Sequence, residues 1–347
     1  MSYIEVLTGN GLTVEQWEDS IFKEYIGQLQ CKKFMGTGSD AMIQVKEDLI
    51  KKAGDAITIG LRGRVVGGLV TGNSKAIGNE GTLAFYNQRI TIDNVRRAIK
   101  FEDIPMSQKR TMFNVLSEGK SALEDEFAVD FDDDVIEALV DTATGRVRGR
   151  YLYGILDSNW DATHSTALGN IDGTNDLLSG SQISIAKRKA IIPVNATAKI
   201  RPTKVVNGKD YEQWFVFWGH TLSIRDLVEK DAAWKNRELN LSPRNDSSVM
   251  FSGSAFKGAW DGVLVYENER IPLVASTVQV SHGLLMGAQA AAVCWGQRTK
   301  FNEEEADFGH DVSYELHEIR GIQKLAFSRD TVEDNGVVHV FSAAVAD

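Results

Sequence analysis

Apolar and polar residues alternate with a period of two in several stretches of the chain, a pattern that predicts half-buried or buried β-strands. In residues 55–63, "DAITIGLRG", the apolar positions are Ile57, Ile59 and Leu61. The other strand-like stretches are "RITIDNVRRAIKF" (89–101), "EQWFVFWGH" (212–220), "WDGVLVYENERIPLV" (260–274) and "IQKLAFSRDTVEDNGVVHVFSAA" (322–344). Within the last stretch, Asp334-Asn335-Gly336 has the composition of a hairpin turn, so we expect the flanking apolar runs to pair.

Other stretches have the spacing of amphipathic helices. Residues 105–143 open with Pro105 and Ser107 and then space Met112, Leu116, Leu123 and Phe127 along one helical face. This spacing predicts a long helix, and the run "DFDDD" predicts a break near Asp130. Shorter helices are predicted at 13–30, which Thr13 can cap, at 174–192 and at 221–234.

A glycine-rich excursion, residues 63–86, separates the first two predicted strands. It contains Gly63, Gly67, Gly68, Gly72, Gly78 and Gly81. So long a segment with few large side chains cannot build a core of its own, and long loops inside compact domains are usually functional. Two exposed strands that project from a domain also invite pairing with another chain. We therefore expect the excursion to lie on a partner.

Composition and charge narrow the function classes. The chain has 347 residues, of which 43% are hydrophobic, and a formal net charge of -10, which argues against a protein that grips nucleic acid through its phosphates. Cys31 and Cys294 are far apart and are expected to be reduced and buried. No signal peptide is expected, and the longest nearly apolar run, which starts at Leu284, is too short to cross a membrane.

The densest cluster of potential metal ligands is "FNEEEADFGHD", residues 301–311. Metal ligands must converge on one point. In an extended segment Glu303 and Glu305 face one side and Glu304 the other, so few of them can share an ion. The nearby His317-Glu318 pair lacks the second histidine of a zinc-hydrolase helix. We therefore interpret the cluster as structural and expect no metal or other cofactor.

Other candidate sites are weaker. Asp130, Asp132 and Asp134 have the spacing of a calcium loop, but the glycine and glutamate that such a loop needs are absent, so helix capping and solvation are the expected roles. We expect the segment that contains His164, Asp172 and Asp176 to be a polar loop. The six histidines are scattered along the chain, and one that follows aromatic residues, His220, is expected to be a hydrogen-bonded core residue.

Several stretches in order along the chain are similar to signatures of tailed-bacteriophage major capsid proteins with the Hong Kong 97-type fold. In one branch of that family, a run like Gly262-Val263 followed by Glu267 to Pro272 precedes a segment like Leu284 to Ala291. The resemblance also covers "GDAITIGLRG", "FYNQRITIDNVRRAI", "FNEEEADFGHDVSYELHEIRGIQKLAF" and "GVVHVFSAAVAD". It is strongest over residues 55–105 and 250–347.

The resemblance implies an α+β fold with the parts of that family. They would be an N-terminal arm (1–54), an E-loop with its strands (55–103), a peripheral domain with a spine helix (104–150), a mainly axial domain (151–258) and a strand-rich closing part (259–347). It also implies a structural protein of the virion that is not an enzyme and that assembles in the host bacterial cytoplasm into hexamers and pentamers of an icosahedral shell.

The implied partners are further copies of the chain, a portal, scaffolding and cement proteins, and packaged double-stranded DNA bound without sequence specificity; no membrane is implied. The candidate inter-subunit contact residues are Arg62, Arg64, Lys75, Arg89, Arg96, Arg97, Glu303, Glu304, Glu305 and Asp307, with the arginines meeting acidic neighbours. Two alternatives stay open at this point. One is an encapsulin-like shell protein, and the other is a metal-dependent hydrolase that uses Glu303, Glu305, Asp307 and His310.

Overall fold

The computed structural model describes residues 29–50, 54–111, 113–143, 146–192, 198–207, 210–240, 254–329 and 331–346. The helix predicted over 13–30 therefore lies almost wholly outside the described residues. The chain divides into two compact units: the smaller includes Arg96–Ala128 and Thr299–His317, and the larger includes Gly27–Val95, Val129–Arg298 and Glu318–Asp347. In the described residues no helix is long and apolar enough to cross a membrane.

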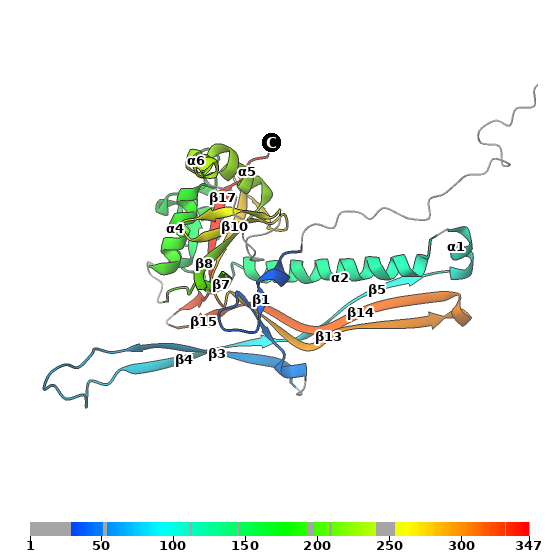
Figure 1. Ribbon diagram of the computed structural model, residues 1–347, viewed down its shortest axis with the longest axis horizontal. Helices are drawn as coiled ribbons and strands as arrows, with labels where there is room; N and C mark the ends of the chain where they lie inside the picture. Colours follow the sequence, from blue (N-terminus) through cyan, green and yellow to red (C-terminus); the bar gives the residue numbers. More distant parts are fainter. Residues whose placement is uncertain are drawn as a thin grey trace, which may run out of the picture. The chain divides into compact units, whose positions relative to one another are not determined.

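Helices and strands alternate irregularly along the chain (Figure 1). The helices are α1 (Ile104–Arg110), α2 (Val115–Val140), α3 (His164–Gly169), α4 (Gly180–Ile191), α5 (Thr221–Lys230) and α6 (Ala232–Asn240). The strands are β1 (Met35–Gly36), β2 (Ile43–Lys46), β3 (Ala56–Val66), β4 (Thr82–Thr91), β5 (Asp93–Phe101), β6 (Tyr151–Tyr153), β7 (Thr203–Asn207), β8 (Asp210–Gly219), β9 (Phe256–Trp260), β10 (Val263–Glu267), β11 (Leu273–Ala275), β12 (Gln279–Met286), β13 (Ala291–Ala306), β14 (Asp311–Lys324), β15 (Ala326–Ser328), β16 (Val332–Asp334) and β17 (Val337–Ala343).

A mixed sheet with the order β6-β17-β12-β8-β10-β9 forms the centre of the larger unit, with β11 paired to β12 and β7 to β8. Alternation along β8 sends its side chains to opposite faces. Phe215 and Phe217 pack in a core with Ile183 of α4. On the other face, Trp218 packs in a core with Ile136 of α2. The sheet therefore lies between two apolar layers, and its central strands read as continuous apolar runs because both faces are covered.

In the smaller unit, α2 begins against an aromatic cluster on the strands. The rings of Phe101 and Phe301 each lie within 5.6 Å of the ring of Tyr314, and the ammonium of Lys120 lies 4.4 Å from the ring centre of Phe301. Gly119 allows this approach, because a Cβ there would lie 2.0 Å from Cζ of Phe101.

A second, five-stranded sheet of the chain has the order β1-β2-β13-β14-β5.

The predicted break in the long helix is wrong in position. Helix α2 runs without interruption through Asp130, and the chain breaks earlier, between α1 and α2. There Asn114 starts the second helix, since its Oδ1 accepts hydrogen bonds from the backbone N–H groups of Leu116 and Ser117. A local cap therefore determined the boundary, and the aspartate run did not.

The aspartates of "DFDDD" are also not explained by capping and solvation. The buried carboxylate of Asp132 accepts the backbone N–H groups of Gln30 and Cys31. Asp133 and Asp134 form ion pairs with arginines from distant segments, namely Arg270 and Arg320. Because these partners compensate the charges, the run stays helical.

The hairpin predicted at Asp334-Asn335-Gly336 is wrong as well. Strand β16 pairs with β15, whereas β17 pairs with β12 and β6. The tripeptide connects strands of two different sheets, and Asp334 is fully buried instead of lying in an exposed turn. The other predicted strands are present, but 89–101 is divided between β4 and β5 and 260–274 between β10 and β11. The helices at 174–192 and 221–234 are confirmed, the second being divided at Asp231.

Candidate functional site

Strands β3 and β4 form a long antiparallel hairpin that contains the predicted excursion (Figure 1). Its base belongs to the larger unit's core, where Ile57, Ile59 and Ile90 are buried with Phe327. The side chain of Gln88 adds two hydrogen bonds there, donating to the carbonyl of Lys324 and accepting from the N–H of Ala326, at 2.9 and 2.8 Å. The base is therefore firmly attached.

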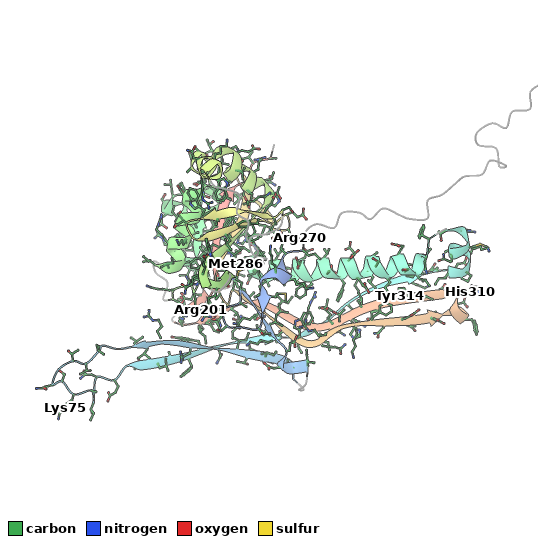
Figure 2. The ribbon with its side chains drawn as sticks, viewed as in Figure 1. Lys75, Arg201, Arg270, Met286, His310 and Tyr314 are labelled. Atoms are coloured by element: carbon green, nitrogen blue, oxygen red, sulfur yellow. The ribbon has the colours of Figure 1, made fainter. Side chains whose placement is uncertain are left out.

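Beyond the base, the excursion exposes apolar side chains to solvent. Among them, Leu69 is 92% exposed and Ile77 84% exposed. The other exposed large apolar residues of the hairpin are Val65, Val66, Leu83 and Phe85. Lys75 lies in the loop that joins the far ends of the two strands (Figure 2). Such exposed apolar surface on a single chain is typical of a contact with another molecule.

A basic cleft of about 520 Å³ lies beside the base of the hairpin. Its cationic lining residues are Arg62, Arg64, Lys199, Arg201 and Arg329, and its apolar lining includes Leu61, Val66, Tyr86 and Ala198. Two of the cations have carboxylate partners at the rim, Arg201 with Asp40 at 3.3 Å and Arg329 with Glu333 at 2.7 Å. In the part of the chain that the structure describes, Arg62, Arg64 and Lys199 form no ion pair.

The acidic run lies at the turn between β13 and β14, where Figure 2 labels His310. Glu303, Glu304 and Glu305 end strand β13 and are exposed, as is Asp307 in the short 3₁₀ turn that follows. Phe308 follows Asp307 in this turn and is fully exposed, with a positive φ of 56°. We call residues 303–308 the acidic tip; among the described residues its four carboxylates form no ion pair.

The other arginines predicted to make contacts are engaged within their own chain. Their partners are Asp55 for Arg89 at 3.0 Å, Glu315 for Arg96 at 3.7 Å and Glu126 for Arg97 at 3.3 Å. These side chains are all at least one-quarter exposed, so each pair contributes little to stability. The arginine side chains themselves remain 42 to 65% exposed, which leaves room for a second partner.

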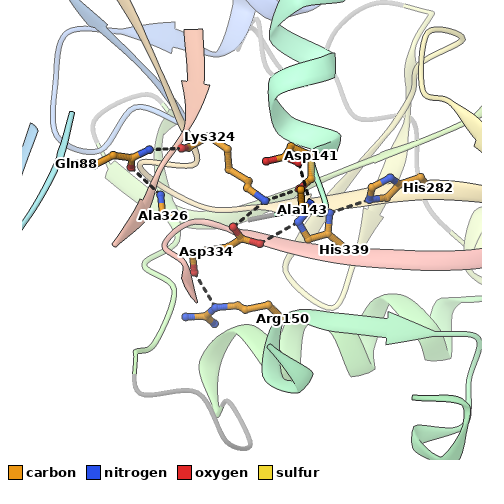
Figure 3. Close-up of polar contacts among 9 residues, drawn as sticks. All are labelled: Gln88, Asp141, Ala143, Arg150, His282, Lys324, Ala326, Asp334 and His339. Carbon is orange, nitrogen blue, oxygen red and sulfur yellow. Dashed lines mark hydrogen bonds and ion pairs between the residues drawn. The ribbon is translucent and has the colours of Figure 1, made fainter. Parts of the chain in front are cut away.

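A buried polar network contains histidines that the sequence left scattered (Figure 3). His339 lies 3.0 Å from Asp334 and 2.7 Å from His282, and the ammonium of Lys324 lies 2.9 Å from the same aspartate. If Asp334 accepts from Nε2 of His339, then Nδ1 of His339 accepts from His282. The guanidinium of Arg150 donates to the carbonyl oxygens of Asp334 and Ala198, at 2.8 and 2.7 Å.

Burial controls protonation in this network. It lowers the pKa of His282 and of His339 well below the ordinary 6.5, so both imidazoles are neutral at neutral pH. Burial also raises the pKa of Asp334 to about 7, against the opposing effect of Lys324. The network joins strands β12, β14 and β17 through hydrogen bonds and an ion pair, which is a structural role.

Groups that could hold a metal are missing from the residues that the structure describes, since no three His, Cys, Asp or Glu side chains converge there. Asp176 is buried and accepts the N–H groups of Ile155 and Asp172, so Asp172 and Asp176 lie in a hydrogen-bonded polar loop as predicted, whereas His164 begins helix α3. The two cysteines are buried and free, as expected. His220 starts α5 by accepting the N–H of Leu222, and it is only half-buried.

Four residues of the basic cleft and the acidic tip were not among those predicted from the sequence, namely Lys199, Arg201, Arg329 and Phe308. Lys199 and Arg201 are neighbours in the sequence, but they meet Arg329 and the hairpin arginines Arg62 and Arg64 only through the fold. Phe308 carried a signal that was not used, because an aromatic residue inside an acidic turn has no neighbours along the chain to bury it.

Comparison with known proteins gives a family. The sequence matches the family model described as phage capsid protein over residues 5–346. Solved structures similar in fold include the cyanophage Pam1 capsid (23% identity, 100% of both chains, TM-score 0.83), the Ralstonia phage GP4 capsid (23%, 99% of both, 0.80) and the capsid of Helicobacter pylori bacteriophage KHP30 (15%, 96% of both, 0.72). A comparison with curated proteins gave no match.

The hydrolase alternative fails with this result, because the matched family is one of structural proteins of the virion. The α+β arrangement agrees with the structural matches over the full length of the chain. The chain therefore belongs to the phage capsid protein family and has its Hong Kong 97-type fold.

Proposed function

We propose that copies of this chain assemble into hexamers and pentamers of an icosahedral head that encloses double-stranded DNA. The observation that carries the proposal is the β3–β4 hairpin, which exposes large apolar side chains such as Leu69, Ile77 and Phe85. Burying this surface on a neighbouring copy would remove it from water, and the excursion has no core of its own to do so.

In this proposal, the parts of the chain divide the work of assembly. The N-terminal arm (1–54) and the E-loop with its strands (55–103) reach neighbouring copies. The axial domain (mainly 151–258) surrounds the centre of each capsomer, the peripheral domain with its spine helix (104–150) forms the rim, and the strand-rich closing part (259–347) contributes to both. Head-to-tail contacts between identical copies close into rings when the rotation between them allows closure. Many weak contacts then add up, because each later contact is effectively intramolecular.

The predicted contact residues fit this role to different degrees. Arg62, Arg64 and Lys75 are exposed on the hairpin, and the carboxylates of the acidic tip are exposed as well. We propose that these groups form ion pairs between copies. A portal, scaffolding and cement proteins remain proposed partners, and the net charge of -10 favours a lining that does not bind the packaged DNA tightly.

The test is assembly of the purified chain, with and without the excursion. In the variant, residues 64–82 are deleted and closed with a tight turn. We expect the wild type to form closed shells in negative-stain images and the deletion to give a folded subunit that forms none, with the circular dichroism and unfolding transition of the wild type. A wild type that stays monomeric at high concentration over a range of salts would refute the proposed function. A deletion that unfolds would place the excursion in the core.

A further inference from the structure

Two oppositely charged surfaces each carry several groups that have no counter-charge among the described residues. Arg62, Arg64 and Lys199 of the basic cleft form no ion pair among the described residues, and neither do the four carboxylates of the acidic tip. In a chain with a net charge of -10, a cleft lined by five cations and by no carboxylate is unusual. Complementary charge of this kind steers association and selects partners.

The two surfaces also differ in shape. The cleft is concave, and Leu61, Val66 and Tyr86 contribute an apolar wall. The acidic tip is the turn of a hairpin, and the ring of Phe308 projects from it without any cover. Phe308 adopts a left-handed backbone conformation that is uncommon for a non-glycine residue and is often found at functional positions. An aromatic side chain surrounded by charges is a typical anchor for a pocket with a charged rim.

We propose that the basic cleft of one copy binds the acidic tip of a second copy, with Phe308 against the apolar wall and the carboxylates beside Arg62, Arg64 and Lys199. This inference rests on the proposed function, since it names which surfaces two copies use. It adds Lys199 and Phe308 to the contact and gives the two hairpin arginines one defined partner.

A second copy is favoured over nucleic acid as the occupant. A phosphate backbone would satisfy the cations but would leave the apolar wall uncovered, whereas the acidic tip supplies both the anions and an aromatic ring. The tip also gains from the contact, because Phe308 is removed from water. The contact would thus account both for the cations of the cleft and for the exposed ring of Phe308.

The first test crosslinks two distinguishable copies. One copy carries Phe308→Cys and the other Ala198→Cys, and the two native cysteines are buried and therefore slow to react. After co-assembly, a short bis-maleimide should give a covalent dimer only when both variants are present. The matched control replaces Ala198→Cys with Leu156→Cys, which is exposed but lies outside the cleft. Shells that form without the specific dimer overturn the inference and leave the proposed function intact.

The second test exchanges the charges. Arg62→Glu with Arg64→Glu should lower shell yield at least about tenfold, and adding Glu303→Lys with Glu305→Lys should restore most of it. Glu124→Lys with Glu137→Lys on α2 is the control that should not restore it. Rescue by the α2 pair would overturn the inference in favour of a different acidic surface. Normal assembly of the arginine variant with a loss of DNA filling alone would overturn it in favour of a phosphate site. If the wild type forms no shells, the proposed function fails and this inference fails with it.

Discussion

Acidification should destabilise the subunit through the buried pair His282 and His339, and replacing one histidine should remove one of the two histidine contributions. The perturbation is His282→Asn, whose side-chain amide can still donate a hydrogen bond to Nδ1 of His339. Both imidazoles are neutral in the folded state because burial lowers their pKa well below 6.5. They gain protons only on unfolding, so the unfolded state binds more protons at low pH and stability falls as the pH falls.

The magnitude follows from proton linkage. A histidine with an unfolded pKa of 6.5 that stays neutral when folded costs about 2 kcal/mol of stability between about pH 7 and about pH 5. Two such histidines cost about 4 kcal/mol. Asp334 acts in the opposite sense, since its pKa is raised to about 7 and the folded state takes up its proton first; this offsets about 2 kcal/mol. The network should therefore lose about 2 kcal/mol on acidification.

The assay is urea unfolding of dissociated subunits at several pH values, followed by the fluorescence of buried tryptophans such as Trp218. In His282→Asn, the loss of stability between about pH 7 and about pH 5 should be about 2 kcal/mol smaller than in the wild type. His310→Asn is the matched control, since His310 is exposed and lies outside the buried network. Equal pH dependence in His282→Asn and the wild type would refute the reasoning.

Three further outcomes are expected. The triple variant Glu303→Gln, Glu305→Gln and Asp307→Asn should weaken shell assembly most at low salt, because ion pairs are screened over roughly 8 to 10 Å at physiological salt. A chelator should leave wild-type shells intact. Stoichiometric metal that is bound by the wild type and lost in the variant, with unchanged shell yield, would contradict this prediction. Gly119→Ala should destabilise the subunit by about 1 to 3 kcal/mol in urea unfolding, since the new Cβ would lie 2.0 Å from Cζ of Phe101. Adding Phe101→Ala should relieve the loss. A Gly119→Ala variant as stable as the wild type would disprove the close approach. Arg320→Met should cost about 3 to 5 kcal/mol in the same assay because it removes the guanidinium that pairs with the buried Glu318 at 2.9 Å. A cost below about 1 kcal/mol would show that the pair is not needed.

The local periodicity of the sequence was enough to predict most strands and helices, because one covered face leaves a regular apolar pattern. Strands β3 and β5 were predicted for this reason, whereas β8 was predicted as a buried strand from its run of large apolar residues. The errors came where a side chain acts on a distant segment. Asp132 and Asp334 are of types that usually cap or turn. Asp132 instead accepts the N–H of Cys31, 101 residues away. Asp334 is buried beside His339, which in turn contacts His282, 57 residues away. No local pattern contains that information.

The candidate contact surfaces also combine residues that the sequence could predict with residues that only the fold brings together. The run Glu303 to Glu305 and the excursion were recognisable as stretches of sequence, since each is continuous. The basic cleft was not recognisable, because Arg62 and Arg64 come from one strand while Lys199 and Arg329 come from remote segments. The family resemblance gave the fold and the class of function, yet it could not indicate which charges lack partners in this chain.

The distribution of unsatisfied groups argues that stability and assembly use different parts of the chain. Inside the larger unit, the charged groups Lys324 and Asp334 are buried and paired at 2.9 Å, so they add to the rigidity of the subunit without being available to a partner. On the surface, the carboxylates of the acidic tip and the arginines Arg62 and Arg64 are exposed and unpaired among the described residues, and each new ion pair between copies would contribute at most about 1 kcal/mol. Weak contacts of this kind allow a wrongly placed copy to dissociate, while a copy held at several such contacts at once remains bound. A shell that corrects errors during growth and still closes stably requires that combination, which a subunit with strong and self-satisfied surface charges could not provide.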